Sequence, residues 1–170
     1  MKISILGYSG AGKSTLTNRL GKLYNIPVLH LDTVQYMENW QEREKEEKLK
    51  IVGEFLNKNS SWVIDGTYSG LHFQRRLEES DMIIMLLFNR FVCFKRVVSR
   101  YREFKGHTRP DMADGCCEKL DLEFARWVLF DGRTSKKRAK FKRVAEEYPQ
   151  RTVKIKNQIQ LERFMQGKKK

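Results

Sequence analysis

The sequence predicts an α/β protein in which helices cover both faces of a parallel sheet. Short apolar runs recur along the chain, segments with helical spacing of apolar residues separate them, and no repeat or low-complexity tract interrupts this alternation. Strand–helix–strand units connect by right-handed crossovers, which build parallel sheets with helices on both sides. Since 170 residues with 40% hydrophobic positions suit one buried core, we expect a single domain over residues 1–170.

Five apolar runs are the expected strands. The run at 82–88 is apolar throughout, which is typical of a central strand buried on both faces. The expected strands cover residues 2–6, 27–31, 62–64, 82–88 and 152–155.

Helical spacing fills the intervals between these runs. After Lys13, the residues Leu16, Leu20 and Leu23 fall on one helical face. The charged segment 41–56 contains favourable Glu-to-Lys pairs four residues apart, so its helix should be largely exposed. The expected helices begin at Lys13 and then cover residues 41–56, 90–104, 119–147 and 158–165.

The net charge of +13 is concentrated in the second half of the chain. Residues 1–85 hold 11 Lys and Arg against 11 Asp and Glu, whereas residues 86–170 hold 23 against 10. Such a surface attracts polyanions. These could be a triphosphate with a phosphorylated acceptor, or a nucleic-acid backbone, and composition does not choose between them.

The sequence favours a cytoplasmic protein without a membrane partner. No apolar run approaches the roughly 20 residues that a membrane span needs, and the first ten residues reach glycine before a signal-peptide apolar region develops. The three cysteines, Cys93, Cys116 and Cys117, suit a reducing compartment. No histidine stands at zinc-finger spacing from them, so a structural zinc site is not expected.

The segment GYSGAGKS, from Gly7 to Ser14, matches G-x-x-x-x-G-K-[ST] between an expected strand and an expected helix. Its glycines let backbone N–H groups turn toward phosphate oxygens, and the helix N-terminus adds partial positive charge. Lys13 should reach the β- and γ-phosphates, and Ser14 should ligate Mg²⁺. A turn that merely caps a helix needs no lysine there. We expect ATP or another nucleoside triphosphate, with Mg²⁺, held by Gly7, Ser9, Gly10, Ala11, Gly12, Lys13, Ser14 and Thr15.

Two aspartates follow expected strands and should emerge beside this loop, at the carboxyl edge of the sheet. Asp32 follows the run at 27–31, and Asp65 follows the run at 62–64. Such a carboxylate can hold a Mg²⁺-bound water or accept a proton from an acceptor hydroxyl. We assign Asp65 to the metal and Asp32 to catalysis and substrate binding. The alternative for each is a turn residue or helix cap.

The pocket for the phosphoryl acceptor is expected to be formed by the loops after the second and third strands and by the lid. The segment 33–60 carries Tyr36 and Trp40, which could stack on a ring of the acceptor or pack the charged helix onto the sheet. After Asp65, a loop with two glycines and two hydroxyl residues places Gly66 and Tyr68 as further substrate contacts.

A basic flap is expected at about 105–118, which contains two glycines and a proline. Arg100 and Arg109 flank its start, and cations on a closing flap would stabilise charge on a transferring phosphoryl group and exclude water. The alternative is a solvated basic loop. In the next expected helix, Arg126, Phe130, Arg133 and Lys137 share one face, which could point at phosphates or at solvent.

Five segments within residues 1 to about 135 form a specific combination: GYSGAGKST from Gly7, HLD from His30 with Trp40 nearby, IDGTYSG from Ile64, TRPDM from Thr108, and DLEF from Asp121 before Arg126 and Trp127. In these segments the chain resembles the adenylate-kinase-related P-loop proteins known as DNA topology modulation proteins. The resemblance implies a three-layer fold like that of nucleoside monophosphate kinases, with sheet order 2-3-1-4-5 and a short lid. It also implies that Asp65 helps to position Mg²⁺ and that Arg100 and Arg109 are lid arginines.

The sequence departs from adenylate kinases in two respects. The lid lacks the four cysteines of zinc-bearing lids, and no arginine pair for an AMP phosphate is evident, Arg75 and Arg76 being the nearest candidates. The predicted function is therefore an ATP-dependent phosphotransferase with an unidentified acceptor. The alternative is a nucleotide-dependent regulatory or DNA-binding protein, although the sequence contains no helix-turn-helix, zinc finger or aromatic platform for single strands.

Overall fold

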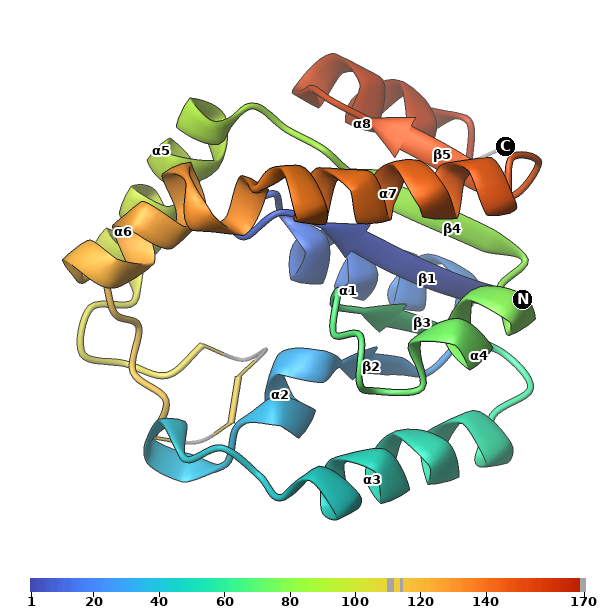
Figure 1. Cartoon of the computed structure of the whole chain (residues 1–170), viewed down its shortest axis with the longest axis horizontal. Coiled ribbons are helices and arrows are strands. Elements are labelled where there is room, and N and C mark those ends of the chain that lie inside the picture. The colour runs from blue at the N-terminus through green and yellow to red at the C-terminus, as the bar shows by residue number, and fades with distance from the viewer. Residues whose placement is uncertain (110–111, 114, 169–170) are drawn as a thin grey trace.

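Strands and helices alternate along the chain in the computed structural model, which describes residues 1–109, 112–113 and 115–168 (Figure 1). The elements are β1 (Lys2–Gly7), α1 (Lys13–Tyr24), β2 (Val28–His30), α2 (Leu31–Gln35), the 3-10 turn η1 (Glu38–Trp40), α3 (Lys45–Lys58), β3 (Trp62–Asp65), α4 (Phe73–Glu79), β4 (Met82–Leu86), α5 (Arg90–Glu103), α6 (Leu122–Leu129), the 3-10 turn η2 (Asp131–Arg133), α7 (Ser135–Glu147), β5 (Thr152–Ile155) and α8 (Gln158–Gln166).

The five strands form one parallel sheet in the order β2-β3-β1-β4-β5, which confirms the predicted fold class and strand order. β1 lies at the centre, where Ile5 pairs with Asp65 of β3 on one side and with Ile84 of β4 on the other. The carboxyl ends of β1, β2 and β3 therefore meet at one edge, on the side where the lid and α6 lie (Figure 1).

Helices cover both faces of the sheet, as the three-layer prediction requires. α7 crosses in front of the sheet in Figure 1 and α1 lies behind it. Two buried clusters fill these layers, because alternate side chains of β1 point to opposite faces. Ile5 packs with α1, α5 and α8, whereas Leu6 packs with α4 and α7. A third cluster, which includes Leu31, Val52 and Trp62, fixes α2 and α3 beside β3.

Two strands end earlier than the apolar runs suggested. The run at 27–31 yields only β2, because Leu31 begins α2 and the Thr33 hydroxyl donates to the His30 carbonyl at 2.8 Å. The run at 82–88 yields β4 to Leu86, and Phe88 is buried beyond the strand end. α2 and α4 are helices that the apolar pattern did not reveal, since both have fewer than eight residues.

The single helix predicted over 119–147 is wrong. The structure has α6, the turn η2 and α7 in its place. Gly132 lies against the preceding helix, where a Cβ would stand 2.7 Å from the Trp127 carbonyl oxygen, so no larger residue fits that turn. Thr134 then caps α7 by accepting a hydrogen bond from the Lys137 amide.

The chain lacks a helix with the length and apolar character of a membrane span, over all the residues that the structure describes. Cys93, Cys116 and Cys117 are free thiols.

Candidate functional site

The loop between β1 and α1 has the backbone shape that its glycines permit. Gly10 has φ +74° and Gly12 has φ +91°, values that side chains with a Cβ rarely adopt. A Cβ on Gly10 would lie 2.5 Å from the carbonyl oxygen of Cys93, so the loop also packs directly on α5. Ala11 is fully buried, Ser9 and Ser14 are half-buried, and Thr15 is exposed in the first turn of α1. The predicted phosphate-binding residues thus form one compact turn at the carboxyl end of β1.

Two cations lie on this loop. Lys13 opens α1, and its Nζ donates to the carbonyl oxygen of Tyr8 at 3.2 Å, across the turn. Arg96 of α5 donates from Nη1 to the Ala11 carbonyl at 2.9 Å, and its guanidinium lies 4.3 Å from the centre of the Phe88 ring. Arg96 was not among the predicted site residues, although it stands one helical turn before Arg100 on the same helix.

Arg133 reaches the loop from η2. Its guanidinium lies 3.9 Å from the centre of the Tyr8 ring and donates to the carbonyls of Val128 and Phe88 at 3.0 and 2.9 Å. The remaining nitrogen, Nη2, is buried and has no oxygen acceptor within the part of the chain described. Of the two orientations that the sequence left open, toward phosphates or toward solvent, Arg133 is buried beside the phosphate loop.

Arg126 and Lys137 do not share a face with Arg133, so the predicted row of cations along one helix is wrong. The break at η2 rotates α6 relative to α7. Arg126 is exposed and forms an ion pair with Asp131 at 3.1 Å, whereas Lys137 lies 3.3 Å from the centre of the Trp127 ring. Trp127 is 45% exposed.

Asp65 lies beside the phosphate loop, at the end of β3. It is almost fully buried, and its Oδ2 is 2.7 Å from Nδ1 of His30 at the end of β2. Nε2 of His30 lies 3.0 Å from Oδ1 of Asn18 on α1. Two residues further on, the Thr67 hydroxyl accepts from the Gly7 amide and donates to the Gly7 carbonyl, both at 3.3 Å. The loop after β3 and the start of the phosphate loop are therefore directly bonded.

The residues at this edge suit magnesium bound together with a substrate. No group of three or more Asp, Glu, His or Cys side chains with metal-binding geometry exists in the ranges that the structure covers. Magnesium does not need one, because it keeps several waters and typically takes one or two protein oxygens plus substrate phosphates. The Ser14 hydroxyl at the start of α1 and the Asp65 carboxylate on the adjacent strand are oxygen donors of that kind.

Asp32 lies in the first turn of α2 and is bonded to the loop after β3. The Tyr68 hydroxyl donates to Asp32 Oδ1 at 2.6 Å. Burial and the negative charge of Asp32 raise the pKa of Tyr68 well above its usual range, so this hydroxyl stays protonated. Gly66 has φ +123°, and a Cβ there would meet the Leu31 side chain at 2.8 Å. The two loops predicted to contact the acceptor therefore form one surface.

Tyr36 and Trp40 contact each other, and Trp40 also contacts the lid. Their rings meet edge to face at 5.3 Å. The Trp40 indole nitrogen donates to the Cys117 carbonyl at 3.1 Å, its backbone amide donates to Cys116 Sγ at 3.3 Å, and Cys116 Sγ donates to the Met37 carbonyl at 3.1 Å. Burial and Asp32 raise the pKa of Tyr36. The acceptor segment and the lid are thus joined at Trp40.

The predicted lid arginines meet on one buried carboxylate. Arg100 Nε donates to Glu118 Oε1 at 2.7 Å, and Arg109 Nε lies 2.6 Å from Glu118 Oε2. Glu118 is only 5% exposed, and sequence reasoning missed it because no local motif marks it. Of the expected lid at 105–118, residues 110, 111 and 114 lie outside the described residues, as does part of the TRPDM motif.

Arg75 and Arg76 do not lie where an acceptor phosphate would bind. Arg75 bonds to Glu79 at 2.6 Å and to Asn57 at 2.8 Å, and Glu79 also bonds Lys2 at the start of β1, opposite the phosphate loop. Arg76 is fully buried, and its nitrogens donate to the carbonyls of Leu71, Gly66 and Tyr68. Arg76 therefore holds the loop after β3 in place.

Lys140 of α7 supports the same loop from the other side and was not predicted. Its Nζ donates to the Thr67 carbonyl at 2.9 Å and to the Ser69 hydroxyl at 2.7 Å, and it lies 3.7 Å from the centre of the Phe73 ring. Burial and the nearby Arg76 lower the pKa of Lys140 to about 8.

This lowered pKa predicts a pH dependence of stability. An unfolded lysine has a pKa of about 10.4, so between about pH 8 and 10 the unfolded chain binds more protons at residue 140 than the folded chain. The contribution of Lys140 to the free energy of unfolding therefore rises with pH across this window. We expect the melting temperature of the wild type minus that of Lys140→Met to increase from about pH 7 to pH 10. A difference that stays constant would contradict this environment for Lys140.

Glu118 should stabilise the conformation of the lid against local opening. Glu118→Gln keeps the shape of the side chain but removes the charge between Arg100 and Arg109. We expect the amides around the lid bond from Glu118 N to His107 O to exchange with solvent about 10 to 100 times faster. Hydrogen exchange followed by mass spectrometry measures this. Glu123→Gln on exposed α6 is the matched control, and equal exchange in both variants would contradict the role of Glu118.

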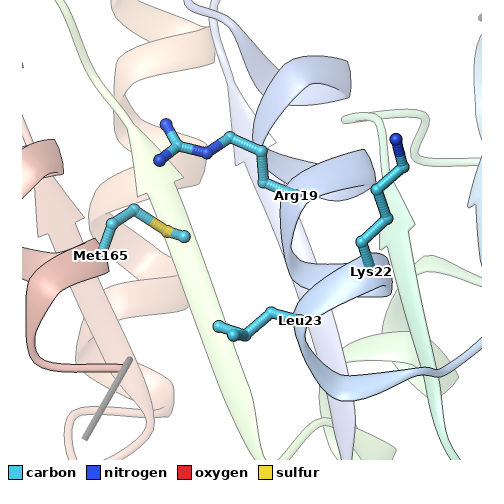
Figure 2. A pocket seen from close by; sticks show the side chains of 4 residues that line it. All are labelled: Arg19, Lys22, Leu23 and Met165. Carbon is cyan, nitrogen blue, oxygen red and sulfur yellow. The ribbon is translucent and has the colours of Figure 1, made fainter.

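A separate shallow hollow of about 360 Å³ lies between α1 and α8 (Figure 2). Its lining residues, Arg19, Lys22, Leu23 and Met165, include none of the predicted site residues. The candidate site is therefore the carboxyl edge of the sheet and not this hollow.

Comparisons with known proteins give structural similarities but no family. No protein-family model matches the chain, and no curated protein matches it. Among solved structures, the chain is similar to an uncharacterized protein from Eubacterium ventriosum, with 19% sequence identity and a TM-score of 0.45. The similarity covers 92% of this chain and 89% of that one.

Proposed function

We propose that the protein is an ATP-dependent phosphotransferase of the adenylate-kinase-related P-loop class, acting with Mg²⁺ on a small acceptor. One observation carries the proposal. The G-x-x-x-x-G-K-S segment forms a left-handed glycine turn between β1 and α1, and Asp65 stands on the strand paired with β1. The resemblance to DNA topology modulation proteins and a cytoplasmic location belong to the same proposal, and the three free cysteines support the latter.

The phosphate loop would bind and orient the triphosphate. Amides at the start of α1 face the phosphate oxygens, and Lys13 exchanges its bond to the Tyr8 carbonyl for the β- and γ-phosphates. Ser14 and Asp65 would hold the magnesium ion, which neutralises charge on the phosphates when bound. His30 fixes the Asp65 carboxylate through its 2.7 Å contact.

Residues on both sides of the carboxyl edge of the sheet would take part in phosphoryl transfer. Asp32 accepts the proton of the acceptor hydroxyl as the hydroxyl oxygen attacks the γ-phosphorus and ADP leaves. Arg100, Arg109 and Arg133 supply cations for the equatorial oxygens, and closure of the lid excludes water. Tyr68 holds Asp32 from the loop after β3.

A DNA-binding role is the second candidate, and one observation favours it. Helix α7 carries four exposed cations on its outer surface, Lys136, Arg138, Lys142 and Arg143. Such a surface would bind a phosphate backbone with steep salt dependence. It would not depend on Lys13.

A phosphate-transfer screen tests the proposal. Purified protein is incubated with Mg-ATP labelled at the γ-phosphate and with nucleotides, nucleosides and small metabolites, with duplex DNA as a competitor. Transfer of label to a small acceptor that DNA does not inhibit is the expected result. Salt-sensitive DNA binding that Lys136→Ala and Arg143→Ala weaken, without transfer to any acceptor, would favour the second candidate instead.

A further inference from the structure

The acceptor side of the site consists of the segment 33–60 and the loop after β3. Among the described residues, few cations there could bind a phosphate group. Within α3 and the segment before it, Arg43 donates to the Val34 carbonyl and pairs with Glu47, and the buried Lys48 pairs with Glu42 at 2.7 Å. The other cations of the acceptor segment, Lys45, Lys50 and Lys58, are exposed on α3. In α4, Arg75 pairs with Glu79 and Arg76 donates to three backbone carbonyls, as described above.

The cations that approach from the lid and α7 are also engaged. Arg100 and Arg109 both bond Glu118, and the proposed mechanism assigns both to the transferring γ-phosphoryl group and not to the acceptor. Lys140 donates to Thr67 and Ser69 in the loop after β3. Lys119 is exposed and lies 5.7 Å from the centre of the Trp40 ring.

The groups that do face the acceptor side are a carboxylate, a phenol and aromatic rings. Asp32 accepts from Tyr68 at 2.6 Å, and its second oxygen has capacity for a further donor. Tyr36 and Trp40 form an edge-to-face pair beside it. A phosphate dianion placed here would meet the Asp32 carboxylate, whereas a hydroxyl group would donate a hydrogen bond to it.

We infer that the acceptor is an uncharged hydroxyl compound, such as a nucleoside, sugar or polyol, and not a nucleoside monophosphate. This inference rests on the proposed phosphotransferase function. The reaction forms a bond between the acceptor oxygen and the γ-phosphorus and breaks the bond to the β,γ-bridging oxygen. The acceptor proton goes to Asp32, and the products are a phosphate monoester and ADP.

Matched acceptor pairs that differ only in one phosphate test this inference. The pairs are adenosine and AMP, thymidine and TMP, ribose and ribose 5-phosphate, and glycerol and glycerol 3-phosphate, each with Mg-ATP. We expect at least one uncharged member to be phosphorylated with kcat/KM about 100 times that of its phosphorylated partner, because like charges repel at Asp32. Asp32→Asn should lower kcat about 100-fold or more and narrow this preference, whereas Glu38→Gln, exposed in the same segment, should change neither.

The outcomes separate this inference from the function on which it rests. Calorimetry with Mg-ATP on the same samples reports nucleotide binding, and its absence would overturn both. Nucleotide binding with preferred transfer to the phosphorylated members, or with transfer to none of the uncharged ones, would overturn the acceptor class alone. Unchanged transfer in Asp32→Asn would likewise contradict the role of Asp32.

Discussion

Replacing Lys13 by alanine is expected to abolish phosphoryl transfer while leaving the fold intact. Lys13 is the first residue of α1, and its Nζ bonds only the Tyr8 carbonyl within the loop. Loss of one half-exposed hydrogen bond changes the free energy of unfolding by about 1 kcal/mol. Loss of the ammonium from the β- and γ-phosphates removes a charge that matters most in the transition state, and we expect kcat to fall about 1,000-fold or more.

Lys22→Ala is the matched control for this prediction. Lys22 is exposed on the same helix, lies in the last turn of α1 and lines the hollow of Figure 2, away from the phosphate loop. Thermal unfolding monitors the fold of both variants. Wild-type rates of transfer in Lys13→Ala, to any acceptor found, would remove the kinase interpretation.

Replacing Arg76 by methionine is expected to cause the largest loss of stability. The guanidinium is fully buried and satisfies the carbonyls of Leu71, Gly66 and Tyr68. Burial lowers the pKa of Arg76 to about 10, so the side chain is still charged at neutral pH. Methionine leaves three buried carbonyls without donors, which costs about 3–5 kcal/mol in the free energy of unfolding, or about 10 °C in melting temperature for a domain of this size.

Arg75→Met serves as the comparison, since Arg75 precedes Arg76 in α4 but is partly exposed and paired with Glu79. Exposed pairs of this kind contribute about 0–1 kcal/mol. Denaturant unfolding of both variants measures the difference. If Arg76→Met is as stable as Arg75→Met, the bonds to the loop after β3 do not determine its conformation.

The sheet could be predicted from the sequence because its signals are local. Apolar runs such as 82–88 mark a strand buried on both faces without knowledge of the rest of the chain. The break between α6 and α7 could not be predicted in that way. Residues 119–147 keep helical spacing throughout, whereas the close approach of Gly132 to the Trp127 carbonyl is visible only in the structure.

The candidate site likewise contains residues that local sequence signals predict and partners that such signals do not predict. The phosphate loop is contiguous, so its motif can be recognised, and the edge at which Asp32 and Asp65 lie can be predicted because both follow apolar runs. Their partners come from distant segments. Lys140 and Thr67 are 73 residues apart in sequence, and Glu118 binds Arg100 across the lid. No periodicity within one segment predicts such pairs.

Trp40 illustrates how tertiary contacts decide between open alternatives. The sequence allowed it to stack on an acceptor or to pack α3 onto the sheet. In the structure it donates to Cys117 of the lid and adopts φ +64°, next to Asn39 at φ +57°, while stacking on an acceptor stays a prediction. This left-handed pair turns the chain so that the indole reaches the lid, a geometry that neither residue type signals by itself.

Calorimetric titration of the protein with magnesium and a non-hydrolysable ATP analogue tests the central claim most directly. If the turn between β1 and α1 holds a triphosphate, wild-type protein should bind with a dissociation constant below about 100 µM, and Lys13→Ala should bind at least about tenfold more weakly. No detectable heat of binding at about 1 mM ligand, or equal affinity in the two proteins, would contradict the account.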